Sequence, residues 1–202
     1  MSAAVLSTMA LPSNGSRMVT IIQRSTARMT GLVENLMDLA RAKMGDGLPV
    51  AIEPVSDLAT TIDEVVSELA AGWPHRRIET DLALAAPVPC DRARMAQLLS
   101  NLIANALAHG DASGAVVVRA RTDQDRFSLS VENQGSAIPP ADMRRLFQPF
   151  SRTSTHAREG LGLGLYIASQ IALAHEGELT ASSDDQLTCF TLRIPLKRLV
   201  AV

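Results

Sequence analysis

Four polar side chains recur at a spacing of four residues within an otherwise apolar segment near the middle of the chain. They are Gln97, Asn101, Asn105 and His109. On a helix this spacing places them in one row along the surface. A buried amide without a hydrogen-bond partner costs about 1–3 kcal/mol, so the row is expected either to cap neighbouring backbone groups or to face a ligand. Because amide oxygens suit a hard cation, a Mg²⁺-bound ligand is the chemical hypothesis.

Glycines at alternate positions form a second unusual segment. Gly160, Gly162 and Gly164 alternate with leucines just before an apolar helical pattern. Their backbone amides could approach a phosphate closely, and the start of a helix favours anions. The segment does not fit the dinucleotide-binding fingerprint, because no strand directly precedes it and the third glycine is one place early. Tight packing of a helix on a sheet is the alternative interpretation.

Two further segments combine polar and aromatic residues after apolar runs. Residues 131–139 place Asn133 and Gly135 in a polar turn behind an expected strand, and residues 146–152 place two phenylalanines ahead of Arg152. Alone, the first is typical of an ordinary turn, and the second is typical of a small core that anchors a loop. The four segments together carry more information than any one of them.

A long amphipathic helix is predicted ahead of these segments, over residues 16–44. Its apolar residues follow a heptad seam, broken once by Ser25, with extra apolar positions that suit a helical bundle better than a simple zipper. The seam residues are Met18, Ile22, Ser25, Met29, Leu32, Leu36 and Leu39. Residues 1–11 resemble the end of a shorter preceding helix. The mismatch between the two arms of this hairpin implies an upstream segment, a partner chain, or both.

From residue 48 onward the pattern alternates between strands and helices. Strands are expected at 50–55, 77–82, 115–121, 127–131, 179–182 and 187–194, and helices at 56–71, 91–109 and 160–175. Strands on one side and helices on the other predict an α+β two-layer sandwich. The stretch 132–159, with one short helix near 141–146, is long for a compact domain and is typical of a lid or binding loop.

Composition narrows the function classes. The 202 residues carry a net charge of −2 and a pI of about 6.1, so no general field attracts nucleic acid or an anionic membrane. Six aromatic residues are too few for a base-stacking surface, and two cysteines do not form a secreted disulfide framework. No run of 18 apolar residues occurs, and the start lacks a signal-peptide pattern. We expect a cytoplasmic protein without nucleic-acid partners or membrane insertion.

The order and spacing of the four segments resemble the ATP-binding domain of bacterial sensor histidine kinases over about residues 50–198. The helix at 16–44, which ends in the sequence NLMDLAR, resembles the second helix of that family's dimerisation hairpin. The resemblance implies a partial hairpin over residues 1–47 and a Bergerat-type catalytic domain over residues 48–202. It also implies Mg²⁺ and ATP, a phosphotransferase of two-component signal transduction, a homodimer through residues 16–44, and a response regulator receiver domain as partner.

The resemblance also assigns roles to individual residues. Asn105 is expected to hold Mg²⁺ with the help of Asn101, and Asn133 to accept a hydrogen bond from the adenine amino group. Asn101 and Arg152 are the expected catalytic residues, with Arg152 near the terminal phosphate or the docking helix. The residues implied to contact nucleotide are Asn101, Asn105, His109, Asn133, Gly135, Ile138, Phe150, Arg158, Gly160, Leu161, Gly162, Leu163 and Gly164.

Three positions depart from the family pattern. Asn133 replaces a frequent aspartate, so its hydrogen bond to adenine loses charge assistance. Ala137 stands where a second glycine is common, and Ala108 stands where a phosphate-contacting lysine is frequent. The chain has only two lysines, and we hypothesise that Arg152 and Arg158 compensate.

No histidine in the chain has the setting of the family's phosphate acceptor. The four histidines are His75, His109, His156 and His175. The acceptor is therefore expected about ten residues before Met1, or is lacking, and autophosphorylation in cis is not expected. The γ-phosphoryl group would pass to a histidine-bearing segment supplied elsewhere.

Three alternative functions differ in what they require. A degenerate, non-catalytic regulator that docks a response regulator or partner kinase agrees with the departures above. An ATP hydrolase of the chaperone and gyrase group would need a glutamate at Asn101, because an amide cannot take a proton from water. A serine kinase of the anti-sigma type would share the ATP site, but that family lacks a dimerisation hairpin, so the long heptad helix over residues 16–44 argues against it.

Overall fold

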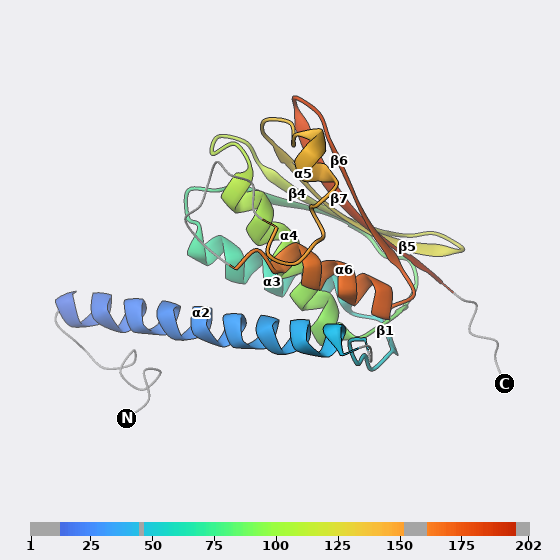
Figure 1. Cartoon of the computed structure of the whole chain (residues 1–202), viewed down its shortest axis with the longest axis horizontal. Coiled ribbons are helices and arrows are strands. Elements are labelled where there is room, and N and C mark those ends of the chain that lie inside the picture. The colour runs from blue at the N-terminus through green and yellow to red at the C-terminus, as the bar shows by residue number, and fades with distance from the viewer. Residues whose placement is uncertain (1–12, 45–46, 152–160, 197–202) are drawn as a thin grey trace.

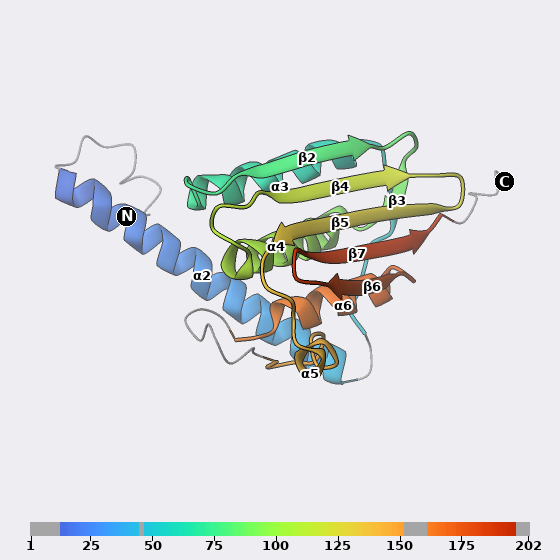
Figure 2. The same cartoon turned by 90° about the horizontal axis from the view of Figure 1, so that it is seen from above.

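A five-stranded mixed sheet forms one layer of the molecule. β5 (Arg126–Gln134) pairs antiparallel with β4 (Val116–Thr122) and with β7 (Leu187–Pro195). β6 (Glu178–Ser183) extends the sheet beyond β7, and β2 (Ile78–Ala83) runs parallel to β4 at the other edge. The order is therefore β2-β4-β5-β7-β6, which Figure 2 shows face on. The paired strands expected around residues 122–126 are confirmed.

Three helices form the second layer on one face of this sheet (Figures 1 and 2). They are α3 (Leu58–Gly72), α4 (Arg92–His109) and α6 (Gly164–Ala174), with α4 packed between the other two. The predicted α+β two-layer sandwich is confirmed. This computed structural model describes residues 13–44, 47–151 and 161–196. The helix expected at residues 1–11 lies outside the described residues.

Alternating burial along the strands explains how the two layers adhere. On β4, β5 and β7, every second side chain points toward the helices and is buried, while the intervening ones are exposed or half-buried. Burying an apolar side chain contributes about 1.5–3 kcal/mol, so this period of two fixes which face of the sheet the helices cover. The fully buried side chains of the three strands include Val116, Val118, Ala120, Phe127, Leu129, Val131, Phe190 and Leu192.

Several expected boundaries differ in the structure. The strand expected at 50–55 is limited to β1 (Glu53–Val55), which pairs with β3 (Val88–Cys90), a strand that the sequence did not predict. Pro54 lies opposite Pro89 in this pair, an arrangement tolerated because a two-stranded sheet consists only of edges. The short helix expected at 141–146 is the single turn α5 (Pro140–Met143).

The predicted start of α3 is corrected by one residue, and the predicted start of α4 is confirmed. α3 follows Asp57 rather than Ser56, and Asp57 forms an ion pair with Arg92 at the start of α4. The hydrogen bond from Arg92 lowers the pKa of Asp57 below its ordinary value. α4 follows the predicted cap Asp91, whose side chain accepts from the backbone N–H of Arg94 at 3.1 Å.

The cap of α4 is also the point where three distant segments meet. The second oxygen of Asp91 accepts from the backbone N–H of Ala51 at 3.0 Å, and the backbone N–H of Asp91 donates to Nε2 of His175 at 3.0 Å. His175 is buried at the end of α6, with Nδ1 2.8 Å from the carbonyl oxygen of Ile171. Burial acts to raise the pKa of Asp91, but the hydrogen bonds from Ala51 and Arg94 outweigh it and lower that pKa.

The long helix α2 (Ser13–Lys43) contacts the second layer through a buried carboxylate near its end (Figure 1). Asp38 is only 3% exposed, and its Oδ2 accepts from Nη1 of Arg94 at 2.7 Å and from Nε2 of Gln97 at 2.9 Å. The Arg94 guanidinium also donates to Oε1 of Gln97 at 2.8 Å. These three side chains, the Asp38 cluster, join α2 to α4.

Several apolar residues of the seam on α2 are exposed in the part of the chain that the structure describes. Met18, Met29 and Leu36 are more than half exposed, whereas Leu39 packs into the core. The helix expected over residues 16–44 is confirmed, and among the residues that the structure describes the buried apolar side chain of its seam is Leu39, near its end. No helix among the described residues combines the length and apolarity that crossing a bilayer requires.

The Asp38 cluster leads to a test of stability. Replacing Asp38 by Ala leaves Arg94, whose side chain is only 18% exposed, without its charge partner, so the free energy of unfolding should fall by about 3 kcal/mol. Urea denaturation followed by circular dichroism measures this change. The matched control is Asp63→Ala, an exposed aspartate on α3, which should change stability by less than about 0.5 kcal/mol. Equal losses in both variants would contradict the importance of the cluster.

Candidate functional site

The row of polar residues on α4 divides into two functional parts. Its apolar side is buried on the sheet through residues that include Leu98, Leu99, Leu102, Ile103 and Ala106. Asn101 and Asn105 are half-buried and His109 is exposed, but Gln97 is bound within the Asp38 cluster. Neither of the two interpretations of the row, backbone capping or ligand binding, describes Gln97, because the carboxylate of Asp38 on α2 satisfies its amide.

Asn101 lies against the start of α6. A Cβ atom added to Gly164 would be 3.2 Å from Oδ1 of Asn101, so a larger residue would fit here only if the Asn101 side chain moved by a few tenths of an ångström. Nδ2 of Asn101 is buried and has no hydrogen-bond partner among the described residues. A buried, unsatisfied amide at the start of a helix is the arrangement expected where a ligand completes the hydrogen bonding.

The glycine segment contributes both conformation and close approach. Gly162 has a φ of 68°, in the left-handed region that other residues rarely adopt. Leu163 is buried beside it, and Leu161 is exposed. The helix therefore begins at Gly164 and not at Gly160. Gly160 lies outside the described residues, and its phosphate contact stays a prediction from the sequence.

Asn133 is the last inward-facing residue of β5. It continues the buried alternation of Phe127, Leu129 and Val131, and it is 5% exposed. Its Nδ2 donates to the backbone carbonyl oxygen of Gln134 at 3.1 Å. Because the amino group is engaged in this way, Oδ1 is the atom of Asn133 that can accept a hydrogen bond from a ligand.

The end of α4 closes against Asn133. A Cβ atom added to Gly110 would be 2.6 Å from the carbonyl oxygen of Ala106 and 2.9 Å from Nδ2 of Asn133. The backbone N–H of Asp111 donates to the carbonyl oxygen of Gln134 at 2.7 Å. Hydrogen bonds from the backbone and hydroxyl of Ser113 lower the pKa of Asp111, so this residue carries a negative charge at neutral pH.

Thr188 is a site residue that sequence reasoning missed. It lies directly opposite Asn133 in the β5–β7 register and is 5% exposed. Its Oγ1 is 2.7 Å from Oγ of Ser183, and that hydroxyl accepts from the backbone N–H of Ile138 at 3.0 Å. The network fixes the loop that contains Gly135 and Ile138 to the β6–β7 hairpin. The alternation of Phe190 and Leu192 along β7 would have indicated that Thr188 faces inward.

The two phenylalanines have different environments. Phe147 packs edge-on against Phe190, with ring centroids 6.5 Å apart and an interplanar angle of 78°. Phe150 is 58% exposed and has a φ of 61°, an uncommon conformation for a bulky residue. Phe147 therefore anchors the loop to the core, as one sequence interpretation expected. Arg152 and Arg158 lie outside the described residues.

A cleft of about 300 Å³ separates α2 from α3 and α4. Asn101 lies on its wall, so this residue faces the cleft as well as the start of α6. The lining residues are Gly31, Glu34, Asn35, Val65, Glu68, Ala96, Gln97, Ser100 and Asn101. Side chains of α2 thus lie across this cleft from Asn101.

Gly110 provides a test of how tightly this site is built. Gly110→Ala should lower the free energy of unfolding by about 1–3 kcal/mol, because the new methyl group meets the backbone of α4. It should also move the side-chain amide resonances of Asn133 in a ¹⁵N NMR spectrum. Gly72→Ala is the matched control, since nothing lies within 4 Å of the added atom and helix propensity favours alanine. An unchanged stability of the Gly110 variant would contradict the close contact.

Comparisons with known proteins agree with this geometry. A family model described as "Histidine kinase-, DNA gyrase B-, and HSP90-like ATPase" matches residues 90–198. A bacteriophytochrome of Pseudomonas aeruginosa is 35% identical over 181 residues, which is 88% of this chain and 25% of that protein. The probable sensor histidine kinase TcrY of Mycobacterium tuberculosis is 36% identical over 179 residues, which is 87% of this chain and 37% of that protein. The chain thus spans between a quarter and two fifths of these relatives' lengths.

Solved structures share the fold. The Acinetobacter baumannii histidine kinase AdeS has a TM-score of 0.71 at 22% identity, covering 97% of this chain and 91% of its own. Full-length ShkA in complex with AMPPNP also has a TM-score of 0.71, at 25% identity, covering 96% of this chain and 41% of its own.

Proposed function

The chain belongs to the family of histidine kinase-, DNA gyrase B- and HSP90-like ATPases, and we propose that it transfers the γ-phosphoryl group of ATP to a histidine. Its fold and relatives are those of the ATP-binding catalytic core of sensor histidine kinases. The acceptor histidine lies on a segment other than those in this chain. A location in the cytoplasm follows from this proposal.

One observation carries the proposal: the unsatisfied amide of Asn101 lies at the glycine-lined start of α6. A phosphate group at the start of a helix accepts hydrogen bonds from backbone N–H groups and from a nearby side-chain amide. Asn105 follows Asn101 by one helical turn and presents a second amide. A ligand with several anionic oxygens would satisfy this set of donors.

The donor set also fits a magnesium ion held jointly with phosphate. Asn105 would hold the ion through its Oδ1 with Asn101 assisting, because Mg²⁺ prefers oxygen ligands and takes few of them from protein. The ion would neutralise charge on the phosphate oxygens. The residues of the chain contribute position rather than covalent chemistry: they fix the triphosphate so that the terminal phosphorus faces the acceptor imidazole.

The adenine base would lie beyond the C-terminal end of α4, beside Gly110 and Asn133. Oδ1 of Asn133 accepts from the adenine amino group, while Thr188 and the loop containing Gly135 and Ile138 border the base. The buried position of Asn133 and the engagement of its Nδ2 support this assignment. An uncharged acceptor gives a weaker hydrogen bond than a carboxylate would.

The remaining nucleotide contacts are proposed from the sequence. His109, Phe150, Leu161 and Leu163 would border the nucleotide. Arg152, Arg158 and Gly160 would act from the lid, where the two arginines supply the positive charge that Ala108 lacks. Arg152 would stabilise the charge that develops on the transferred phosphoryl group.

We also propose a homodimer through α2, with a response regulator receiver domain as a further partner. The exposed apolar side chains along α2 support the dimer, because soluble monomers rarely leave such a stripe uncovered.

Nucleotide binding tests the proposed site. Calorimetric titration with Mg²⁺-ATP should show binding, and Asn133→Asp should tighten it by about tenfold because the acceptor gains a charge. Gln124→Glu adds a similar charge in the β4–β5 turn, at the opposite end of β5, and should leave the affinity unchanged. Weaker binding by Asn133→Asp would contradict the adenine placement. Absence of wild-type binding at millimolar ATP would favour the non-catalytic regulator.

Oligomeric state tests the role of α2. The wild-type chain should have the mass of two chains in light scattering, and Met29→Glu combined with Leu36→Glu should give the mass of one. Charges buried in a dimer seam lack partners and oppose association. Ile52→Glu, at an exposed apolar residue outside α2, should preserve the dimer. A wild-type monomer at micromolar concentration would refute the proposed interface.

A further inference from the structure

We propose that Arg76 is a positioning residue for the adenine end of the nucleotide site. It holds the end of α4 against β5, so that Oδ1 of Asn133 is presented to the base. This inference rests on the proposed function, because the consequence for binding requires a nucleotide.

Arg76 lies in the turn between α3 and β2, far in sequence from the end of α4. Its Nη1 donates to the carbonyl oxygen of Leu107 at 3.2 Å and to that of Gly110 at 3.3 Å. Carbonyl groups in the last turn of a helix lack helical partners, and a cation there interacts favourably with the helix dipole. The guanidinium thus acts as a side-chain cap for α4.

The backbone around Arg76 is held on both sides. The backbone N–H of Arg76 donates to the carbonyl oxygen of Trp73, at the end of α3, at 2.9 Å, and the carbonyl oxygen of the next residue, Arg77, accepts from the backbone N–H of Val116 at 2.9 Å. The guanidinium of Arg76 thus reaches the end of α4 from a turn that is bound to both α3 and β4.

The capped end of α4 directly contacts the adenine-binding asparagine. Gly110, whose carbonyl Arg76 binds, approaches Asn133 so closely that no Cβ atom fits between them. The carbonyl oxygen of Gln134 accepts from the backbone of Asp111 at 2.7 Å and from Nδ2 of Asn133 at 3.1 Å. A shift of the helix end would change both hydrogen bonds, and with them the direction in which Oδ1 of Asn133 points.

Arg76 is retained in this position at an energetic cost. Its Nε and Nη2 are buried without hydrogen-bond partners among the described residues. Unsatisfied buried donors destabilise a fold, so simple stability does not account for the guanidinium. An orienting role does, because two carbonyls of the helix end are held by one rigid planar group.

Base selectivity distinguishes this role from a purely structural one. Adenine offers an amino group to Oδ1 of Asn133, whereas guanine presents a carbonyl oxygen at the same position. Arg76→Met keeps the apolar stem but removes both hydrogen bonds, and it should weaken ATP binding by about tenfold with little effect on GTP. The ATP-to-GTP affinity ratio should therefore fall by about tenfold, and Arg76→Lys should restore part of it.

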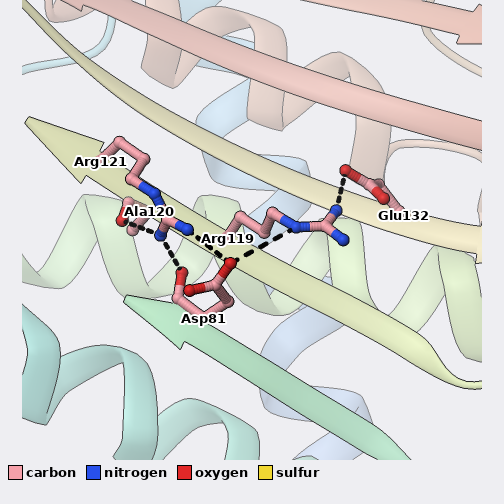
Figure 3. Close-up of polar contacts among 5 residues, drawn as sticks. All are labelled: Asp81, Arg119, Ala120, Arg121 and Glu132. Carbon is pink, nitrogen blue, oxygen red and sulfur yellow. Dashed lines mark hydrogen bonds and ion pairs between the residues drawn. The ribbon is translucent and has the colours of Figure 1, made fainter. Parts of the chain in front are cut away.

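The control is an arginine that also donates to two backbone carbonyls but lies away from Asn133. Arg121, on the face of the sheet that the helices leave open, donates to the carbonyl oxygens of Asp81 and Ala120, as Figure 3 shows. Arg121→Met should leave the ATP-to-GTP ratio unchanged. A ratio that is also unchanged in Arg76→Met, or equal losses for both nucleotides, would overturn the proposal.

A second measurement separates this inference from the proposed function. Without nucleotide, amide hydrogen exchange at Asp111 should accelerate by about tenfold in Arg76→Met and by a smaller factor in Arg76→Lys, because the helix end opens more readily. Slow exchange in both variants would refute the positioning role even if ATP binds. If amide exchange at Asp111 is faster in the variants but the wild-type chain binds no ATP, the coupling between Arg76 and the end of α4 stands and the proposed nucleotide function is refuted. If Arg76→Met does not fold, the exchange measurement and the affinity ratio are taken from Arg76→Lys instead.

Discussion

The burial of one side of α4 against the sheet is the constraint on which the rest of the structure depends. Leu98, Leu102 and Ile103 are completely buried, which fixes the rotation of the helix about its axis. Once that rotation is fixed, Asn101 and Asn105 lie side by side at one edge of the buried apolar side of the helix, where they are half-buried. The amides are thus positioned by hydrophobic packing, without any contribution from the ligand that they would bind.

Both ends of α4 are held by side chains from distant parts of the chain. Asp91 caps the start and is bound to Ala51 and His175, while Arg76 caps the end. The helix contacts α6 at Asn101 and β5 at Asn133 through glycines that have no side chain to separate the backbones. A triphosphate site and a base site can therefore share one rigid helix, which keeps their spacing constant.

The contact between α2 and α4 combines a buried charge with a largely exposed apolar seam. Asp38 and Arg94 satisfy each other away from water, and Gln97 completes the cluster. Such a buried pair specifies one arrangement of two helices more strongly than it stabilises it, because desolvation offsets much of the attraction. The apolar residues before it on α2 are exposed, so the end of α2 sets its orientation on α4, and the middle of α2 is the surface through which the proposed dimer would form.

Local periodicity was sufficient to determine α4 with its asparagines, the glycine start of α6, and the part of β5 up to Val131. These features depend on residues within one or two turns of a helix or a few positions of a strand, and the sequence alone predicted the helices together with the two-layer class. It ended the strand at residue 131 and placed Asn133 in a turn, whereas β5 continues through Gln134 and buries Asn133. Only the tertiary structure assigned Gln97 to Asp38, Thr188 to the strand position opposite Asn133, and Arg76 to the end of α4. Each of these pairs joins residues more than thirty positions apart, and their proximity arises from strand register and helix packing, which no local pattern encodes.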